Sequence, residues 1–229
     1  MDIDIHLDYI YNCLVINGEN NLYNINKRKN MENKKSFNKK KIEKLVRKLL
    51  IELHDDPDRA GLVETPKRVA KMYCEIFEGQ LYTNEEIAQM FNKCFDIQEV
   101  NKEGFDGLVV EKNINAFSTC EHHLATIYDM KISIGYIPKG KVIGLSKLNR
   151  IAQMVCKRLQ LQEKIGQDIA EVLSLILGTE DIAVYISAKH MCVAMRGIKD
   201  IQSSTDSACL RGAFRTSPAL RSEFYSMVK

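Results

Sequence analysis

The amino-acid sequence predicts an α+β fold with a mostly antiparallel sheet. Three observations lead to this prediction. Apolar residues recur at helical spacing between residues 42 and 106, they alternate with a period of two in several segments after residue 107, and a long helical region separates the alternating segments. Strand pairs on either side of a pair of helices are typical of this fold class.

The first part of the fold is predicted to be helical. Three helices are expected within residues 42–106, and each has its own sequence signal. The signals are, in chain order, an apolar stripe from Ile42 to Leu53, the pair Thr65-Pro66 as N-cap and first turn, and a capping box formed by Thr83 and Glu86.

The second part, residues 107–229, is predicted to hold the sheet. The predicted strands begin at Leu108, span 127–137 and 142–145, and include Val184, Ile186 and Ala188. Pro138–Lys141 is predicted to form a hairpin turn between the second and third of these strands. Ser146 is expected to cap a helical region that reaches Gly178 with a break at Gln162-Glu163, and Ser217-Pro218 to start a last helix.

Residues 1–41 differ from the rest of the chain in composition. They contain eight Lys and Arg, five Asp and Glu, and nine Asn, so they carry the whole net charge of +3. This composition predicts a disordered, Asn- and Lys-rich extension without chemistry of its own. A basic arm that touches nucleic acid or an acidic surface is the alternative, but aromatic residues hardly interleave the charges. The remaining residues, 42–229, are predicted to form one domain.

Several classes of protein are excluded by composition. The longest uncharged apolar runs, at 9–16 and 172–177, are far shorter than the ~20 residues of a membrane-spanning helix. The acidic first residues do not look like a secretory signal. Seven scattered cysteines fit a reducing compartment. We therefore expect a cytoplasmic protein that binds neither membranes nor nucleic acid.

Metal-ligating residue types gather at two places in the chain. Cys120-Glu121-His122-His123 and His190-Met191-Cys192 offer five candidate ligands for the three protein positions of a catalytic Zn²⁺. His190 and Cys192 share a face if a strand continues through both, whereas Cys120 and His123 share a target only if the chain turns between them. Any histidine left over is a natural acid or base near neutral pH. The alternative is that the cysteines are small core residues and the histidines satisfied polar ones.

A second group of residues could bind an anion. Ser146, Lys147 and Arg150 lie at a predicted helix start, and Arg196 follows Cys192 by four residues. A helix N-terminus with Lys and Arg suits phosphate, although a solvated basic face is the simpler interpretation of these residues alone. The carboxylate of Glu163, beside Gln162, can accept from a purine ring NH and its amino group together.

The sequence resembles the GTP cyclohydrolase I family over roughly residues 42–229, because it contains several long motifs of that family in the same order. The matching segments are 61–71 with Thr65-Pro66-Lys67-Arg68, Cys120-Glu121-His122-His123-Leu124, 136–150 with Gly144-Leu145-Ser146-Lys147, 158–163 with Leu161-Gln162-Glu163, and His190-Met191-Cys192 with Arg196-Gly197. The resemblance implies a tunnelling fold, an antiparallel sheet with two helices on one side, preceded by N-terminal helices. It also implies a homodecamer of two stacked pentamers with active sites between subunits.

The resemblance further implies a role for each site residue. Zinc would be bound by Cys120, His123 and Cys192, and protons would be transferred by His122 and His190, with Ser146 assisting in the rearrangement of the ribose. Guanine would be held by Gln162 and Glu163, and the ribose and triphosphate by Ser146, Lys147, Arg150, Arg196 and, from a neighbouring subunit, Arg68.

The implied reaction is zinc-dependent ring opening of GTP to formate and 7,8-dihydroneopterin triphosphate, the first step of pterin biosynthesis for folate or tetrahydrobiopterin. An ordinary GTPase is disfavoured because the chain lacks a Gly-x-x-x-x-Gly-Lys-Ser/Thr loop. Two alternatives stay open. One is a lyase similar to 6-pyruvoyl-tetrahydropterin synthase, although such enzymes use three zinc histidines. The other is a non-catalytic scaffold with a structural zinc, although such a copy would be expected to lose His122, His190 or Glu163.

Overall fold

The computed structural model describes residues 35–100 and 107–229. The chain divides into two units, Met1–Phe37 and Asn38–Lys229, and the second unit holds the elements described below. The extension predicted for residues 1–41 lies mostly outside the described residues, as does the end of the predicted helical segment at 101–106. Within the described residues, no helix is both long enough and apolar enough to cross a membrane.

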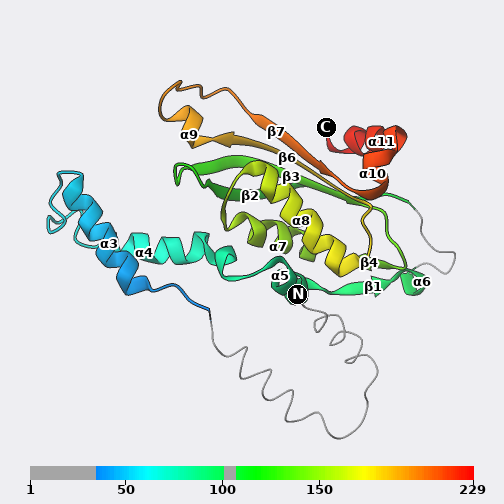
Figure 1. Ribbon diagram of the computed structural model, residues 1–229, viewed down its shortest axis with the longest axis horizontal. Helices are drawn as coiled ribbons and strands as arrows, with labels where there is room; N and C mark the ends of the chain where they lie inside the picture. The colour runs from blue at the N-terminus through cyan, green and yellow to red at the C-terminus, as the bar shows by residue number, and fades with distance from the viewer. Residues whose placement is uncertain (1–34, 101–106) are drawn as a thin grey trace, which may run out of the picture. The chain divides into compact units, whose positions relative to one another are not determined.

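A five-stranded sheet forms the centre of the fold, in the order β5-β2-β3-β6-β7 (Figure 1). Its neighbours pair antiparallel except for the short parallel pair of β5 with β2. The strands are β2 (Val109–Cys120), β3 (Thr126–Tyr136), β5 (Leu159–Gln160), β6 (Ile182–His190) and β7 (Thr205–Leu210). The predicted α+β class with an antiparallel sheet is confirmed.

The register of this sheet brings several strand ends together. Thr119 at the end of β2 pairs with Thr126 at the start of β3, and Ile127 pairs with His190 at the end of β6. Cys120 pairs with Gln160 of β5. The two groups of Cys and His residues therefore lie at the same end of the sheet.

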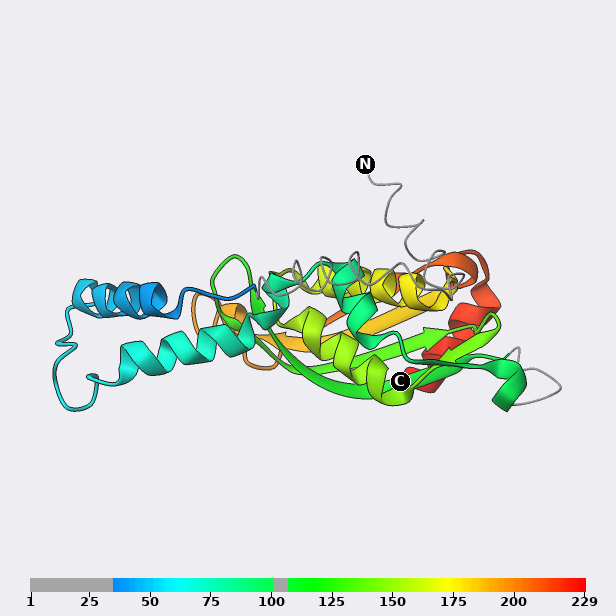
Figure 2. The same cartoon turned by 90° about the horizontal axis from the view of Figure 1, so that it is seen from below.

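Two helices cover one face of the sheet, α7 (Leu145–Cys156) and α8 (Gln162–Leu177) (Figures 1 and 2). Their apolar residues pack against the strands in the main core, where Ile151, Ile165 and Ile169 are fully buried. Burial of each such side chain contributes roughly 1.5–3 kcal/mol. Helix α8 ends at Gly178, which adopts the left-handed conformation (φ 69°) that glycine tolerates best.

A smaller apolar cluster lies on the opposite face of the sheet. Ala183 belongs to it whereas its neighbour Val184 belongs to the main core, as expected from the alternation of side chains along β6. Phe214 from α10 (Gly212–Thr216) and Phe224 from α11 (Pro218–Val228) complete this cluster. A Cβ atom at Gly135 would lie only 2.7 Å from the Phe224 ring, so glycine is required for this close approach.

The three helices predicted before the sheet are present, together with a short 3-10 helix. They are α3 (Lys39–Glu52), α4 (Thr65–Ile76), the short 3-10 helix η1 (Glu78–Leu81) and α5 (Asn84–Phe91). The predicted capping box is present, because the Thr83 hydroxyl accepts from the Glu86 backbone N–H and the Glu86 carboxylate accepts from the Thr83 N–H. A four-residue helix, α6 (Ile97–Val100), follows β1 (Cys94–Asp96).

Three local predictions were wrong. Glu64 and Gly144 occupy the N-cap positions of α4 and α7, so Thr65 and Ser146 lie inside the helices and do not cap them. The residues after Pro138 do not form a hairpin with β3, because β2 and β6 already occupy both of its edges. Instead, β4 (Lys141–Ile143) pairs with β1 in a separate two-stranded sheet.

A buried ion pair joins the N-terminal helices to the core. Arg158 lies between α7 and α8, and its guanidinium donates to Asp168 of α8 at 2.9 Å, to Asn84 Oδ1 at 2.8 Å, and to the carbonyl oxygens of Gly79 and Tyr82. The side chains of Arg158 and Asp168 are only 12% and 4% exposed. Arg158 thereby satisfies backbone carbonyls of the segment that precedes α5.

We expect Asp168→Asn to destabilise the protein by about 3 kcal/mol, because it leaves the buried Arg158 cation without its counter-charge. Urea unfolding at one fixed protein concentration measures this change. Asp58→Asn is the matched control, since it removes an exposed partner of Arg47 and should leave the unfolding midpoint unchanged. Equal midpoints for the two variants would contradict a structural role for the buried pair.

Candidate metal centre and active site

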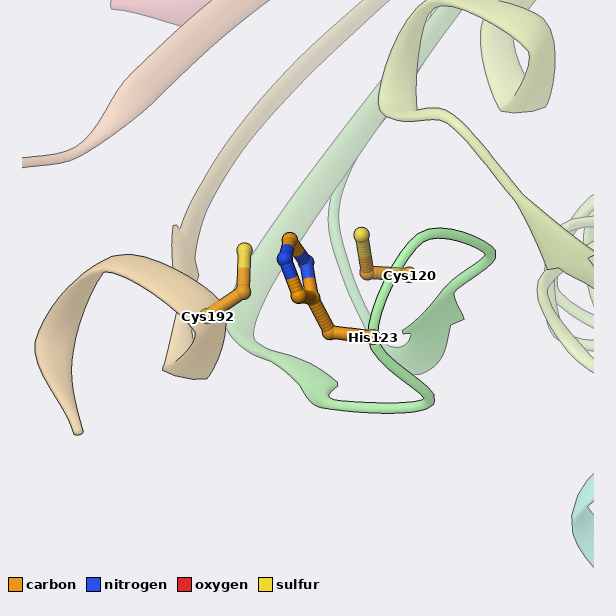
Figure 3. A group of neighbouring side chains, drawn as sticks. All are labelled: Cys120, His123 and Cys192. Atoms are coloured by element: carbon orange, nitrogen blue, oxygen red, sulfur yellow. The ribbon is translucent and has the colours of Figure 1, made fainter. Parts of the chain in front are cut away.

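Cys120, His123 and Cys192 converge at the end of the sheet (Figure 3). Cys120 is the last residue of β2, and His123 lies in the turn that follows. That turn is closed by two backbone bonds, from the Leu124 N–H to the Cys120 carbonyl and from the Cys120 N–H to the Ala125 carbonyl. Leu124 takes a positive φ of 52°, which a non-glycine residue adopts only at a cost in free energy. The chain therefore does turn between Cys120 and His123, as their shared target requires.

Cys192 lies outside the strand that holds His190. Strand β6 ends at His190, and Cys192 lies in the one-turn helix α9 (Met191–Ala194). The strand therefore does not continue through both residues, which was the condition for them to share a face. The turn of helix nevertheless directs the Cys192 sulfur towards His123, which lies between the two cysteines in Figure 3.

The donor set fits a zinc ion. One ligand atom from each of the three residues lies within 4.8 Å of the others. Donors around a tetrahedral Zn²⁺ lie about 3.6 Å apart, so a small inward movement completes such a site. Two thiolates and one imidazole with a fourth position left over are typical of catalytic zinc, whereas a structural site uses four protein ligands.

The two cysteine sulfur atoms of the cluster are close enough to affect the pKa of Cys192. Burial raises the pKa of the Cys192 thiol, and the neighbouring Cys120 sulfur raises it further. A divalent cation that binds both sulfurs must displace their protons. Thiol protons therefore compete with metal at this site.

Arg196 contacts the same cluster. Its Nη1 lies 3.1 Å from Nε2 of His123, and because a guanidinium can only donate, His123 Nε2 is the acceptor. A neutral imidazole that ligates a metal through one nitrogen carries a proton on the other. Metal ligation by His123 therefore excludes this bond and releases Arg196.

His190 lies beside the cluster in a half-buried position. Its Nε2 lies 2.8 Å from Oε1 of Gln162, the first residue of α8. Burial lowers the pKa of His190, and the nearby Glu163 carboxylate opposes this effect. Glu163 itself is exposed. Gln162 and Glu163 therefore both interact with His190, Gln162 through a hydrogen bond and Glu163 through its charge.

His122 also belongs to this end of the sheet. It is exposed in the turn next to His123, and their rings meet edge to face with centroids 6.1 Å apart. An exposed imidazole next to a metal ligand is available to exchange protons with solvent or substrate.

Three of the other predicted anion-binding residues lie near the opposite end of β2 from this cluster. Ser146, Lys147 and Arg150 are in the first turns of α7, where Asn149 donates to Glu111 Oε1 at 3.0 Å. Glu111 is near the start of β2 and Cys120 is at its end, and at ~3.3 Å per residue these positions are about 30 Å apart. Arg68 is exposed on α4. One chain therefore places the metal cluster and the α7 cations at opposite ends of its sheet.

Two residues near the site were missed by sequence reasoning. The Thr205 carbonyl and the Ser207 hydroxyl, both in β7, accept from the Gln162 amide. Their sequence neighbourhood carries no motif, and their role depends on the pairing of β7 with β6. Periodicity did not reveal β7 as a strand either.

Comparisons with known proteins identify the family of the chain. The family model described as GTP cyclohydrolase I matches residues 42–229. A protein named GTP cyclohydrolase 1 from Clostridium botulinum (strain Loch Maree / Type A3) is 54% identical over 181 residues, which cover 79% of this chain and 92% of the relative. Proteins of the same name from Clostridium acetobutylicum and Clostridium beijerinckii are 48% and 46% identical, and each match covers 85% of this chain and 99% of the relative.

The family model spans well over half of the chain, and these relatives are matched over nearly their whole length. The tunnelling fold expected from the sequence is consistent with this family and with the sheet and helices described above. The chain belongs to the GTP cyclohydrolase I family.

Proposed function

We propose that this chain hydrolyses GTP to formate and 7,8-dihydroneopterin triphosphate in a zinc-dependent reaction. The observation that carries the proposal is the convergence of Cys120, His123 and Cys192 with His190 beside them, in a chain 46–54% identical to proteins named GTP cyclohydrolase 1. A structural zinc scaffold is a weaker reading, because three ligands leave a coordination position for chemistry.

Cys120, His123 and Cys192 would hold the metal. When bound, zinc supplies the Lewis acidity that makes water a nucleophile near neutral pH. The two sulfur ligands come from the rigid end of β2 and from α9, so the site is built on ordered elements. Their chemistry, soft thiolate with imidazole, favours Zn²⁺ over Mg²⁺ or Ca²⁺.

The remaining residues of the cluster would bind GTP and move protons. Purine carbon 8 is a poor electrophile, and a proton delivered to nitrogen 7 makes it a better one, which is the role we assign to His190. The exposed Glu163 carboxylate would accept from the guanine N1–H and 2-amino group. His122, together with Ser146 from the α7 helix of a neighbouring chain, would exchange protons with the ribose hydroxyls during the rearrangement that precedes closure of the pterin ring.

The triphosphate would serve as a handle and not as a leaving group. Lys147, Arg150, Arg196 and Arg68 would bind it, and this remote binding energy would hold the purine against the metal. Lys147 and Arg150 lie in the first turns of α7, beside the start of β2, whereas Cys120 ends that strand. We therefore expect these two cations to act on a different GTP molecule from the one at the chain's own metal cluster. A complete site therefore requires the α7 cations of a neighbouring chain.

This requirement supports the homo-oligomer that the resemblance implies, a decamer of two stacked pentamers. A head-to-tail arrangement in which each chain supplies its metal cluster to one site and its α7 cations to the next closes naturally into a ring. The proposal also includes two further points. The reaction would be the first step of pterin biosynthesis, for folate or tetrahydrobiopterin, and the protein would be cytoplasmic. The predicted disorder of residues 1–41 also stays a prediction for the residues before α3, which begins at Lys39.

Purified protein incubated with GTP and Zn²⁺ is expected to release one formate per GTP consumed. Oxidation of the same mixture should yield a fluorescent neopterin derivative. Release of inorganic phosphate without formate would contradict the proposal, because a phosphatase leaves the purine ring closed. Binding of GTP with neither product would favour the scaffold alternative.

We expect Cys192→Ser to lose most of its zinc and to abolish formate release, because a neutral hydroxyl replaces a thiolate ligand. Metal analysis of the purified protein, together with the formate assay, measures both effects. Cys74→Ser is the matched control, since Cys74 is a half-buried free cysteine of α4 outside the cluster. Normal zinc content in Cys192→Ser would show that Cys192 is not a ligand.

Two inactive variants are expected to complement each other if the site is shared between chains. Lys147→Ala should fail to hold the triphosphate, and Cys192→Ser should fail to hold the metal. A mixed oligomer assembled from equal amounts of both should recover about a quarter of the wild-type activity, because that share of the sites draws both intact halves from different chains. Mixed oligomers without activity would place both residues in sites formed by a single chain.

A further inference from the structure

We propose that Gln162 is a positioning residue that fixes the orientation and tautomer of His190, and that its side chain does not contact guanine. This inference rests on the proposed function, because it assigns Gln162 a task within the same site. It also changes the role that the family resemblance implies for Gln162, while Glu163 keeps its role as the guanine acceptor.

The orientation of the Gln162 amide follows from its partners. Its Nε2 lies 2.9 Å from the Thr205 carbonyl oxygen and 3.2 Å from the Ile186 carbonyl oxygen, with the Ser207 hydroxyl at 3.1 Å. Carbonyl oxygens can only accept hydrogen bonds, so the atom that faces them must be the NH2 group. A flipped amide would set an oxygen against two carbonyl oxygens.

The opposite end of the amide then faces His190. Gln162 Oε1 lies 2.8 Å from His190 Nε2, and an amide oxygen can only accept. His190 must therefore carry a proton on Nε2, so its tautomer is set by the protein. In the neutral ring, Nδ1 then carries the lone pair, so Nδ1 must take up a proton before His190 can deliver one to nitrogen 7 of the purine.

Burial removes Gln162 from the reach of a substrate. Its side chain is 2% exposed, and both polar atoms of its amide already have partners within the protein. A guanine base could reach this amide only if the residues that bury Gln162 moved aside. Glu163, the next residue, is exposed and has a carboxylate available at the surface.

The elements around Gln162 make its position rigid. It begins α8, and its amide joins that helix to β6 through Ile186 and to β7 through Thr205 and Ser207. His190 ends β6, so a single side chain connects the start of α8, two strands and the imidazole. Groups that transfer protons must be held within about 0.5 Å of their productive position, and these contacts supply that restraint.

The test is the kinetics of Gln162→Met, which keeps an unbranched side chain of similar length but removes both hydrogen-bonding groups. We expect kcat for formate release to fall about 10- to 100-fold, as for a misplaced catalytic group. The KM for GTP should change less than about twofold, because substrate binding is untouched. Glu163→Gln provides the contrast, since loss of a guanine contact should raise KM.

A double-mutant cycle separates positioning from general structural damage. If Gln162 acts through His190, then Gln162→Met should reduce kcat no further when it is added to His190→Ala. Gln160→Met is the matched control, because Gln160 is also a buried glutamine, 1% exposed, whose amide donates to the Val155 carbonyl and not to a histidine. This control should keep a wild-type kcat, and zinc content should be equal in all variants.

A milder variant covers the case in which Gln162→Met fails to fold. Ser207→Ala removes one acceptor that holds the amide, and it should lower kcat severalfold with KM unchanged.

A raised KM in Gln162→Met with normal kcat would overturn the inference and restore the guanine contact. An additive loss in the His190→Ala background would also overturn it. No formate release by the wild-type protein would instead overturn the proposed function itself, and this inference with it.

Discussion

The candidate site depends on the register with which β2, β3 and β6 pair. Because Thr119 pairs with Thr126 and Ile127 with His190, β2 and β6 end at the same edge of the sheet. A shift of one residue would turn every side chain of a strand to the other face and separate the cysteines. The buried isoleucines of β3 and β6, packed under α7 and α8, oppose such a shift. The core therefore stabilises the fold and sets the geometry of the metal cluster.

Sequence reasoning predicted the features that depend on neighbouring residues. Helical spacing located the helices, and the capping box at Thr83 and Glu86 was confirmed. It failed where a distant element decides the outcome. The pairing of β4 with β1 depends on which edges of the sheet are occupied, and no local pattern contains that information.

The same distinction applies to the candidate site. Residue type and spacing left five candidate ligands within 120–123 and 190–192, because Zn²⁺ accepts both thiolate and imidazole. Only the family resemblance singled out Cys120, His123 and Cys192. The surroundings of Gln162 could not be predicted, because its partners Thr205 and Ser207 come from a strand that the periodicity does not reveal. The separation of the α7 cations from the metal cluster likewise follows from the direction of β2 and not from any motif. The structure does not test the catalytic roles of these residues. It does divide them into two groups, one at the metal cluster and one in the first turns of α7.

The contact between Arg196 and His123 links two binding events that otherwise use different atoms. Under the proposed function, a metal ion that takes His123 as a ligand frees the guanidinium, and an anionic substrate gains a cation that the metal-free protein keeps occupied. Thermodynamic reciprocity then requires the bound triphosphate to tighten the hold on the metal by the same factor. A chelator would thus meet more resistance in the presence of nucleotide, and the substrate would protect the cofactor that its own conversion requires.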